Sequence, residues 1–244
     1  MGLNFSAVLG HEIDAEDLRT LPRLLSAARA PQLVHAIGEF AHYINEYRAT
    51  QGELRTMAYD VTDTTWHVDP TSIPLYRDAV GNLTLQAPPP IEEEIGPGRH
   101  RVRFAPVAAR RTVSMEEYWA AGNLFDVAGP AGIGLDIGPH ALRLTCGPRW
   151  WPFLAEPAVQ LATRRVCHEL ARVVGSPLAI YLAIYLADGY TLMDAIMEGA
   201  TIEQIVAQLS AKLGPPEPAL TMLDEETTGD EIRDAYYLDT FAAL

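Results

Sequence analysis

Four polar side chains at helical spacing form the most metal-like pattern in the sequence. His35, Glu39, His42 and Glu46 follow one another at offsets of four, three and four residues, which places them on one face of a helix. Glu39 and His42 also have the Glu-x-x-His spacing that di-iron bundles take from each of two helices. A di-iron site needs a second such pair, and the sequence contains none. We therefore predict a solvated polar face, with a metal or catalytic site as the alternative.

A second group of potential ligands for a divalent ion lies in and beside a predicted half-buried strand over residues 59–69. It consists of Asp60, Asp63, His67 and Asp69. Trp66 and Val68 alternate with polar residues, which indicates one buried and one exposed strand face. The spacing matches no metal motif. We expect an exposed strand face followed by a turn, and we keep His67 and Asp69 with His35, Glu39 and His42 as the first residues to test for enzymatic activity.

The nucleophile and nucleotide-binding patterns are incomplete. Cys167 and His168 are neighbours in a predicted helix, so their side chains diverge, and no Gly-x-Ser-x-Gly motif is present. Gly132-Ile133-Gly134 lacks the third glycine of a dinucleotide-binding loop. We expect a β-hairpin there, turning through residues 138–140. With Cys146 and Cys167 as the only cysteines, the sequence predicts no disulfide framework, no catalytic residue, no cofactor and no resident metal.

Arginines alternate along a second predicted strand. Arg99, Arg101 and Arg103 would share one strand face, and Arg110 and Arg111 follow shortly after. The favoured interpretation is that they neutralise carboxylates of the same chain. The alternatives are a site for an acidic ligand or partner, and phosphate binding. The arginines lack interleaved aromatics and a glycine-rich phosphate loop, so they are a weak nucleic-acid signal.

The end of the chain combines acidic residues with aromatic ones. Residues 224–239 contain seven carboxylates and one arginine, with tyrosines interleaved. Exposed tyrosines among acidic residues are typical of a surface that docks on a basic partner, although a solvated surface is the simpler interpretation. The residues predicted to bind a partner are Asp224, Glu225, Glu226, Asp230, Glu231, Asp234, Tyr236 and Tyr237.

The elements around these residues are predicted from hydrophobic periodicity. Apolar residues recur at helical spacing over residues 31–50, 157–174 and 202–213. Thr201 and Gln204 form a capping box before the third of these helices. The apolar run from Leu178 to Leu186 suits a strand that is covered on both faces, and a first strand is expected from Phe5 to Leu9. These patterns predict an α+β fold with a mixed, largely antiparallel sheet packed against several amphipathic helices.

Length and composition favour one compact domain over residues 1–244. The proline- and glycine-rich stretch 86–98 is a candidate loop between sub-lobes 1–95 and 99–244. A net charge of −14 argues against nucleic acid and anionic membranes as partners and favours a basic protein. All basic residues except Lys212 are arginine, which suggests a GC-rich bacterial source. The N-terminus lacks a secretory signal, and we expect a cytoplasmic location.

In overall character the chain is similar to the cytoplasmic immunity proteins that neutralise bacterial toxins, a resemblance of type rather than of a motif. The resemblance implies that the acidic surface around Asp224 to Asp239 covers the basic active site of a toxin. Two alternatives remain at this stage: an enzyme whose site is assembled from distant residues, and a structural adaptor subunit of a larger assembly.

Overall fold

The computed structural model describes residues 4–13, 21–50, 59, 64–68, 75–77, 83–85, 91–96, 99–103, 111–112, 124–183, 192–217 and 235–242. Within these residues the strands form a seven-stranded sheet, a three-stranded sheet and a two-stranded hairpin, and every pairing between strands is antiparallel. Six α-helices accompany them among the described residues. The predicted α+β fold is confirmed.

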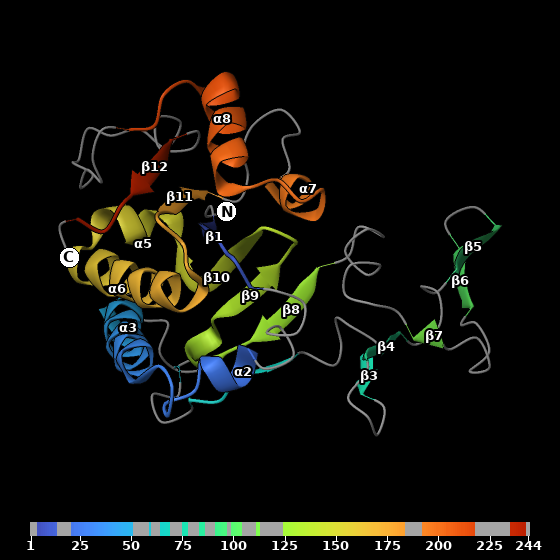
Figure 1. Ribbon diagram of the computed structural model, residues 1–244, viewed down its shortest axis with the longest axis horizontal. Helices are drawn as coiled ribbons and strands as arrows, with labels where there is room; N and C mark the ends of the chain where they lie inside the picture. The colour runs from blue at the N-terminus through green and yellow to red at the C-terminus, as the bar shows by residue number, and fades with distance from the viewer. Residues whose placement is uncertain are drawn as a thin grey trace.

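The seven-stranded sheet has the order β12-β11-β1-β10-β9-β8-β2 (Figure 1). Its strands are β1 (Asn4–Gly10), β2 (His67–Val68), β8 (Phe125–Ala128), β9 (Gly134–Ile137), β10 (Ala141–Arg149), β11 (Ala179–Ala183) and β12 (Tyr236–Asp239). The N-terminal strand β1 therefore lies inside the sheet, between β10 and β11. The sheet contains strands from both sides of residues 86–98, since β1 and β2 precede that stretch and β8 to β12 follow it.

The smaller sheets are formed by the middle of the chain. They consist of β3 (Leu75–Arg77), β4 (Leu83–Leu85) and β7 (Arg111–Thr112), and of β5 (Ile91–Gly96) with β6 (Arg99–Arg103). Because β5 is a strand, most of the expected loop 86–98 that the structure describes is instead one arm of a hairpin. Backbone register pairs Glu93 with Arg101, and whether the arginines neutralise these carboxylates stays a prediction.

Helices cover both faces of the seven-stranded sheet. They are α2 (Leu21–Leu24), α3 (Pro31–Thr50), α5 (Trp150–Ala155), α6 (Pro157–Val174), α7 (Leu192–Met197) and α8 (Ile202–Leu213), with a 3₁₀ turn η2 (Pro130–Gly132). Phe5, Ala7 and Leu9 of β1 belong to the core that includes α3, α5 and α6. Val8 belongs to a second core under α7 and α8. Because successive side chains of a strand point to opposite faces, β1 contributes side chains to the cores on both faces of the sheet.

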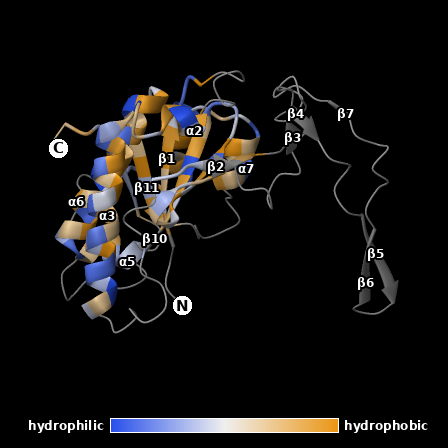
Figure 2. Ribbon diagram, turned by 90° about the horizontal axis from the view of Figure 1, so that it is seen from below, coloured by the Kyte–Doolittle hydropathy of each residue, from blue (hydrophilic) through white to orange (hydrophobic). Residues whose placement is uncertain are grey.

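Strand β11 is buried at all five positions, which confirms the doubly covered strand predicted from its apolar run over the part that the structure describes. Figure 2 shows the same contrast in hydropathy, with hydrophobic strands between helices that carry both hydrophobic and hydrophilic residues. The predicted helices at 31–50, 157–174 and 202–213 are observed as α3, α6 and α8.

Helix α8 shows how the sequence determines a local element. Thr201 accepts from the backbone amide of Gln204, whose side chain accepts in turn from the amide of Thr201 at 2.9 Å, so the predicted capping box is confirmed. Such a cap contributes about 1 kcal/mol. Burying a large apolar side chain contributes about 2 kcal/mol, and α8 buries Ile202, Ile205 and Leu209. Packing therefore outweighs capping in holding α8 against the sheet.

The predicted hairpin through residues 138–140 is also observed, and it connects β9 to β10. The amide of Gly138 donates to Ala141 O at 2.9 Å. A Cβ atom at Gly138 would lie 2.4 Å from the carbonyl oxygen of Ile196, at the end of α7. Glycine is thus required for the turn to approach α7 so closely.

Candidate functional site

The acidic segment between α8 and β12 has both of its ends at one edge of the large sheet. Before the segment, the amide of Glu217 donates to Tyr236 O at 2.9 Å, and Glu217 forms a parallel bridge with Tyr237. After the segment, Tyr236 and Tyr237 begin β12, which is the edge strand next to β11. Residues 218–234, which include Asp224 to Asp234, lie outside the described residues. Their two points of attachment are nevertheless adjacent in space.

Tyr236 and Tyr237 are buried, with relative exposures of 1% and 4%. The expectation that these tyrosines are exposed among the acidic residues is therefore wrong. The Tyr236 hydroxyl donates to Gly214 O at 2.9 Å, and the Tyr237 ring packs against Trp150 with 5.9 Å between centroids. Pairing with β11 turns one tyrosine into each of the two cores. Both tyrosine side chains anchor β12 in the two cores.

Asp239 holds the other end of β12. It is 6% exposed, and Arg164 of α6 donates from Nε to Asp239 Oδ2 at 2.7 Å and from Nη2 to Oδ1 at 3.1 Å. Tyr181 donates its hydroxyl to Oδ2 at 3.1 Å. Burial alone would raise the pKa of Asp239, but these hydrogen bonds and the Arg164 charge outweigh it and lower the pKa. The carboxylate stays ionised and ties β12 to β11 and α6.

The polar face of α3 predicted as a candidate site lies against α6. The two helices lie side by side (Figure 1), and an open surface pocket of about 410 Å³ runs along their seam. It is lined by Gln32, His35, Ala36, Glu39, Arg165, His168 and Glu169. The structure thus brings His35 and Glu39 together with a second imidazole and a second carboxylate from α6, 126 or more residues away in the chain.

Each carboxylate of this seam already has a guanidinium partner. Arg165 Nη1 lies 2.8 Å from Glu39 Oε2, and Arg172 Nη1 lies 3.0 Å from Glu169 Oε2. His35 Nε2 lies 3.7 Å from Glu39 Oε1, and His168 contacts the Phe241 ring. This pattern is typical of a solvated helix–helix seam held by exposed ion pairs. It supports the solvated polar face predicted from the sequence.

The remaining candidate ligands are not gathered into this seam. His42 pairs with Glu46 one turn further along α3, with His42 Nε2 3.4 Å from Glu46 Oε1. His67 belongs to β2, the edge strand opposite β12, while Asp60, Asp63 and Asp69 lie outside the described residues. Among the residues that the structure does describe, no group of three or more His, Cys, Asp or Glu side chains could hold a metal ion.

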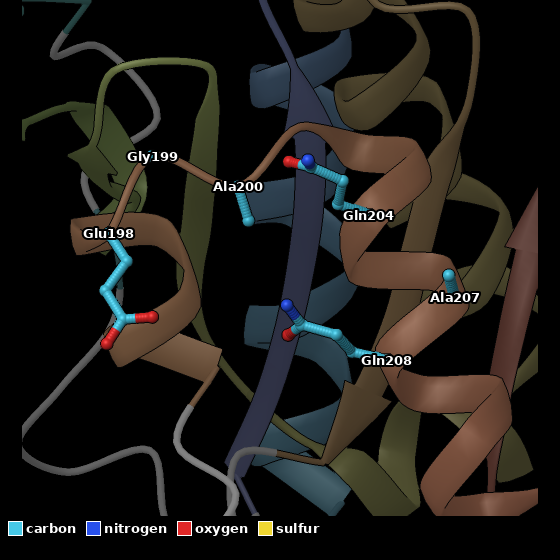
Figure 3. Close-up of a pocket in the computed structure, with 6 residues that line it drawn as sticks. All are labelled: Glu198, Gly199, Ala200, Gln204, Ala207 and Gln208. Carbon is cyan, nitrogen blue, oxygen red and sulfur yellow. The ribbon is translucent and has the colours of Figure 1, made fainter.

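A second surface pocket, of about 480 Å³, lies between α7 and α8. In Figure 3, Gln204 and Gln208 extend from α8 toward the side on which Glu198 projects from the end of α7. Gln204 is engaged in the capping box. The polar side chains that line this pocket are one carboxylate and two amides, a set suited to hydrogen bonding with water or a surface ligand.

Burial suppresses the reactivity of both cysteines. The pKa of Cys167 is raised to about 12, first by burial, and burial raises the pKa of Cys146 well above its usual value. The thiolate is the reactive form of cysteine. The two thiols therefore act as small apolar groups, Cys167 inside the core and Cys146 against it.

Sequence reasoning missed three residues that shape the region around the acidic segment: Arg164, Tyr181 and Asp239. Asp239 appeared as one more acidic residue of the tail, and its partner Arg164 is 75 residues away. No pattern within a short stretch of sequence indicates that Arg164 and Asp239 form a pair. The available signal was the position of Arg164 next to the buried face of a strongly amphipathic helix, where an arginine needs a partner.

Comparisons with protein-family models, with curated proteins and with solved structures found no match for this chain. Among the described helices, none combines the length and apolar character that crossing a bilayer requires. The function therefore has to be argued from the geometry of the chain itself.

Proposed function

We propose that the protein is an acidic protein-binding module of bacterial origin. In this proposal it is a cytoplasmic immunity-type protein that neutralises a cognate basic toxin by covering the toxin's active surface. The charged contacts are Asp224, Glu225, Glu226, Asp230, Glu231 and Asp234. Tyr236 and Tyr237, which the sequence placed in the same surface, are left out because they are buried.

The observation that supports the proposal most is the position of the acidic segment's two ends. Six of the eleven residues from Asp224 to Asp234 are carboxylates, with Arg233 as the only basic residue. Glu217 before the segment and Tyr236 after it are joined by a backbone hydrogen bond. β12 is in turn fixed to α6 by Arg164 and Asp239. A charged segment attached at both ends to a rigid edge loses less freedom on binding than a free tail.

The charge of the whole chain supports the same class of partner. With a net charge of −14, the chain attracts basic proteins and repels nucleic acids and other acidic proteins at long range. Complementary charge raises the association rate and discriminates between partners. A toxin with a basic, phosphate-binding active surface is the natural target for such a protein.

The immunity role is tested by viability. Genes flanking this one are expressed in a susceptible host, with and without the protein, and surviving colonies are counted. The proposal predicts that one flanking product is lethal alone and harmless with the wild-type protein. The triple variant Glu225→Lys, Glu226→Lys and Glu231→Lys should protect poorly, because it reverses half of the carboxylates in the segment.

The control is a second triple reversal with the same change in net charge. Glu12, Glu46 and Glu198 are exposed and lie in other parts of the fold, so their replacement by lysine should leave protection intact. Equal loss of protection in both variants would contradict a role for the acidic segment. A stoichiometric complex with a harmless flanking product would instead indicate an adaptor.

A further inference from the structure

Trp151 is the most exposed large apolar side chain in the part of the chain that the structure describes. Its relative exposure is 46%, whereas the preceding residue, Trp150, is fully buried. Tryptophan carries the largest apolar surface of any side chain, and exposed tryptophans are strongly enriched among the residues that dominate binding energy at protein interfaces. Trp151 therefore needs an explanation that packing within α5 does not give.

Trp151 follows a residue that contacts β12, the strand that comes directly after the acidic segment. Trp150 packs against the Tyr237 ring with 5.9 Å between centroids, and Tyr237 in turn forms the backbone bridge with Glu217. Figure 1 shows α5 next to β12 on the same side of the molecule. The exposed indole thus lies one residue from the contact that joins α5 to the strand where the acidic segment returns to the fold.

Two exposed acidic residues lie on segments that adjoin α5: Glu156 directly follows α5 in the chain, and Glu217 pairs with Tyr237, whose ring contacts Trp150. Glu156 is exposed at the N-terminus of α6, and its side chain does not cap that helix. Glu217 is exposed at the sheet edge. An aromatic anchor with a charged rim is the usual anatomy of a protein interface. Because both of these exposed charges are negative, the complementary surface is basic.

We propose that Trp151 is the apolar anchor of the partner-binding surface, inserting into an apolar pocket that is ringed by lysine or arginine on a basic protein. This inference rests on the proposed function and adds a residue to it. The acidic segment provides long-range attraction, and Trp151 provides the short-range contact that keeps the complex together. The two roles differ in kinetics, since charge acts mainly on association and desolvated anchors act mainly on dissociation.

The test compares Trp151→Ala with wild type in binding to the stoichiometric partner recovered by co-expression with the flanking genes. We expect the affinity to fall by roughly thirtyfold, as at interface hot spots, mainly through faster dissociation and to a similar extent at low and high salt. Intrinsic fluorescence and a thermal unfolding curve should match wild type apart from the lost indole, because the side chain is exposed.

Leu161→Ala is the matched control. Leu161 is 41% exposed, and it lies on α6 one turn before Arg165, which pairs with Glu39 of α3. Its replacement should change the affinity less than twofold, on the order of one exposed contact outside an interface.

Three outcomes decide the inference. Unchanged binding by Trp151→Ala, together with weakened binding by the Glu225, Glu226 and Glu231 reversal, would overturn the anchor and leave the proposed function standing. Unchanged binding by both variants would overturn both. Self-association of the wild-type chain that disappears in Trp151→Ala would also overturn the inference, because the occupant would then be a second copy.

Discussion

Asp239 is the residue on which the edge of the sheet depends. Its carboxylate is 6% exposed and accepts hydrogen bonds from Arg164, from the Tyr181 hydroxyl and from the amide of Phe241. A buried ion pair is retained only when its lone pairs and protons are satisfied in this way. Removing the carboxylate would leave the Arg164 guanidinium desolvated without a counter-charge.

Asp239→Asn should lower the free energy of unfolding by about 3 kcal/mol, because it breaks a buried pair by removing one partner. Urea denaturation at pH 7 measures this loss. Glu39→Gln, which removes the exposed pair with Arg165, is the control and should cost less than about 1 kcal/mol. Equal losses in the two variants would contradict the special role of Asp239.

Since the pKa of Asp239 is lowered in the folded state, the contribution of its carboxylate to the free energy of unfolding should persist at neutral pH and be lost progressively as the pH falls below about 4.

His11 predicts a second pH dependence, of different origin. It is buried beside the β9–β10 turn, its Nε2 donates to Gly138 O at 2.9 Å, and its Nδ1 accepts from the amide of Ile13 at 3.2 Å. The contact at Nδ1 requires the neutral ring, because a protonated Nδ1 cannot accept, whereas the Nε2 contact persists when the ring is protonated. Burial lowers the pKa of His11, the hydrogen bond to Gly138 raises it in part, and the nearby His140 lowers it further.

Because the folded pKa of His11 is lowered, the unfolded chain binds a proton near pH 6.5 that the folded chain does not bind. Stability should therefore fall as the pH drops from 7 toward 5, by up to about 1.4 kcal/mol per pH unit. Gln at position 11 can make both hydrogen bonds without titrating. Urea denaturation at several pH values should show a shallower slope for His11→Gln than for wild type. An unchanged slope in His11→Gln would refute the assignment.

At the scale of elements, the β9–β10 turn can contact α7 closely because Gly138 has no side chain. A Cβ at Gly138 would meet the backbone carbonyl of Ile196 at 2.4 Å, and that carbonyl already accepts from the amide of Gly199. A backbone atom that is part of a helix end cannot move as cheaply as a flexible side chain. The layer of α7 and α8 therefore depends on this glycine for its fit against the sheet.

Gly138→Ala should destabilise the fold by about 2 to 3 kcal/mol through overpacking. Gly38→Ala is the contrasting variant, because Gly38 lies inside α3 and a methyl group added there would meet nothing within 4 Å. It should stabilise the fold by about 0.5 to 1 kcal/mol, since alanine is the better helix former. Thermal and urea unfolding measure both changes. Destabilisation by both would show that the close approach at Gly138 is not the cause.

The sequence predicts local features of the fold better than contacts between distant residues. The capping box at Thr201, the apolar faces of α3 and α6, and the buried character of β11 are local patterns, and all are observed. Strand β12 was not predicted, because Tyr236 to Asp239 is a four-residue run within an acidic tail. Its pairing with β11 and its ion pair with Arg164 join residues more than 50 positions apart.

The same distinction applies to the candidate site. His35 and Glu39 were found from helical spacing, but the pairing of Glu39 with Arg165 depends on the packing of α3 against α6. The acidic character of residues 224–234 is visible in composition, whereas the attachment of that segment at Glu217 and Tyr236 is not. Spacing rules describe residues within one element, and these contacts arise between elements.

At the scale of the whole molecule, charge and architecture support a single account. A sheet with cores on both faces provides a rigid edge, and a net charge of −14 provides attraction toward basic proteins. The buried Asp239 pair makes the edge strand part of that rigid body. The acidic segment whose ends join this edge is the partner-binding surface in the proposed function.

The most direct test of this account is quantitative co-purification of the tagged protein from its native host at low and at high salt, followed by mass spectrometry. The account predicts a stoichiometric basic protein with the wild type, reduced recovery at high salt because charge attraction is screened, and little recovery with the Glu225, Glu226 and Glu231 reversal. The Glu12, Glu46 and Glu198 reversal should recover it like wild type. Isolation of the wild-type chain without any basic protein, or equal recovery by both reversal variants, would contradict the account.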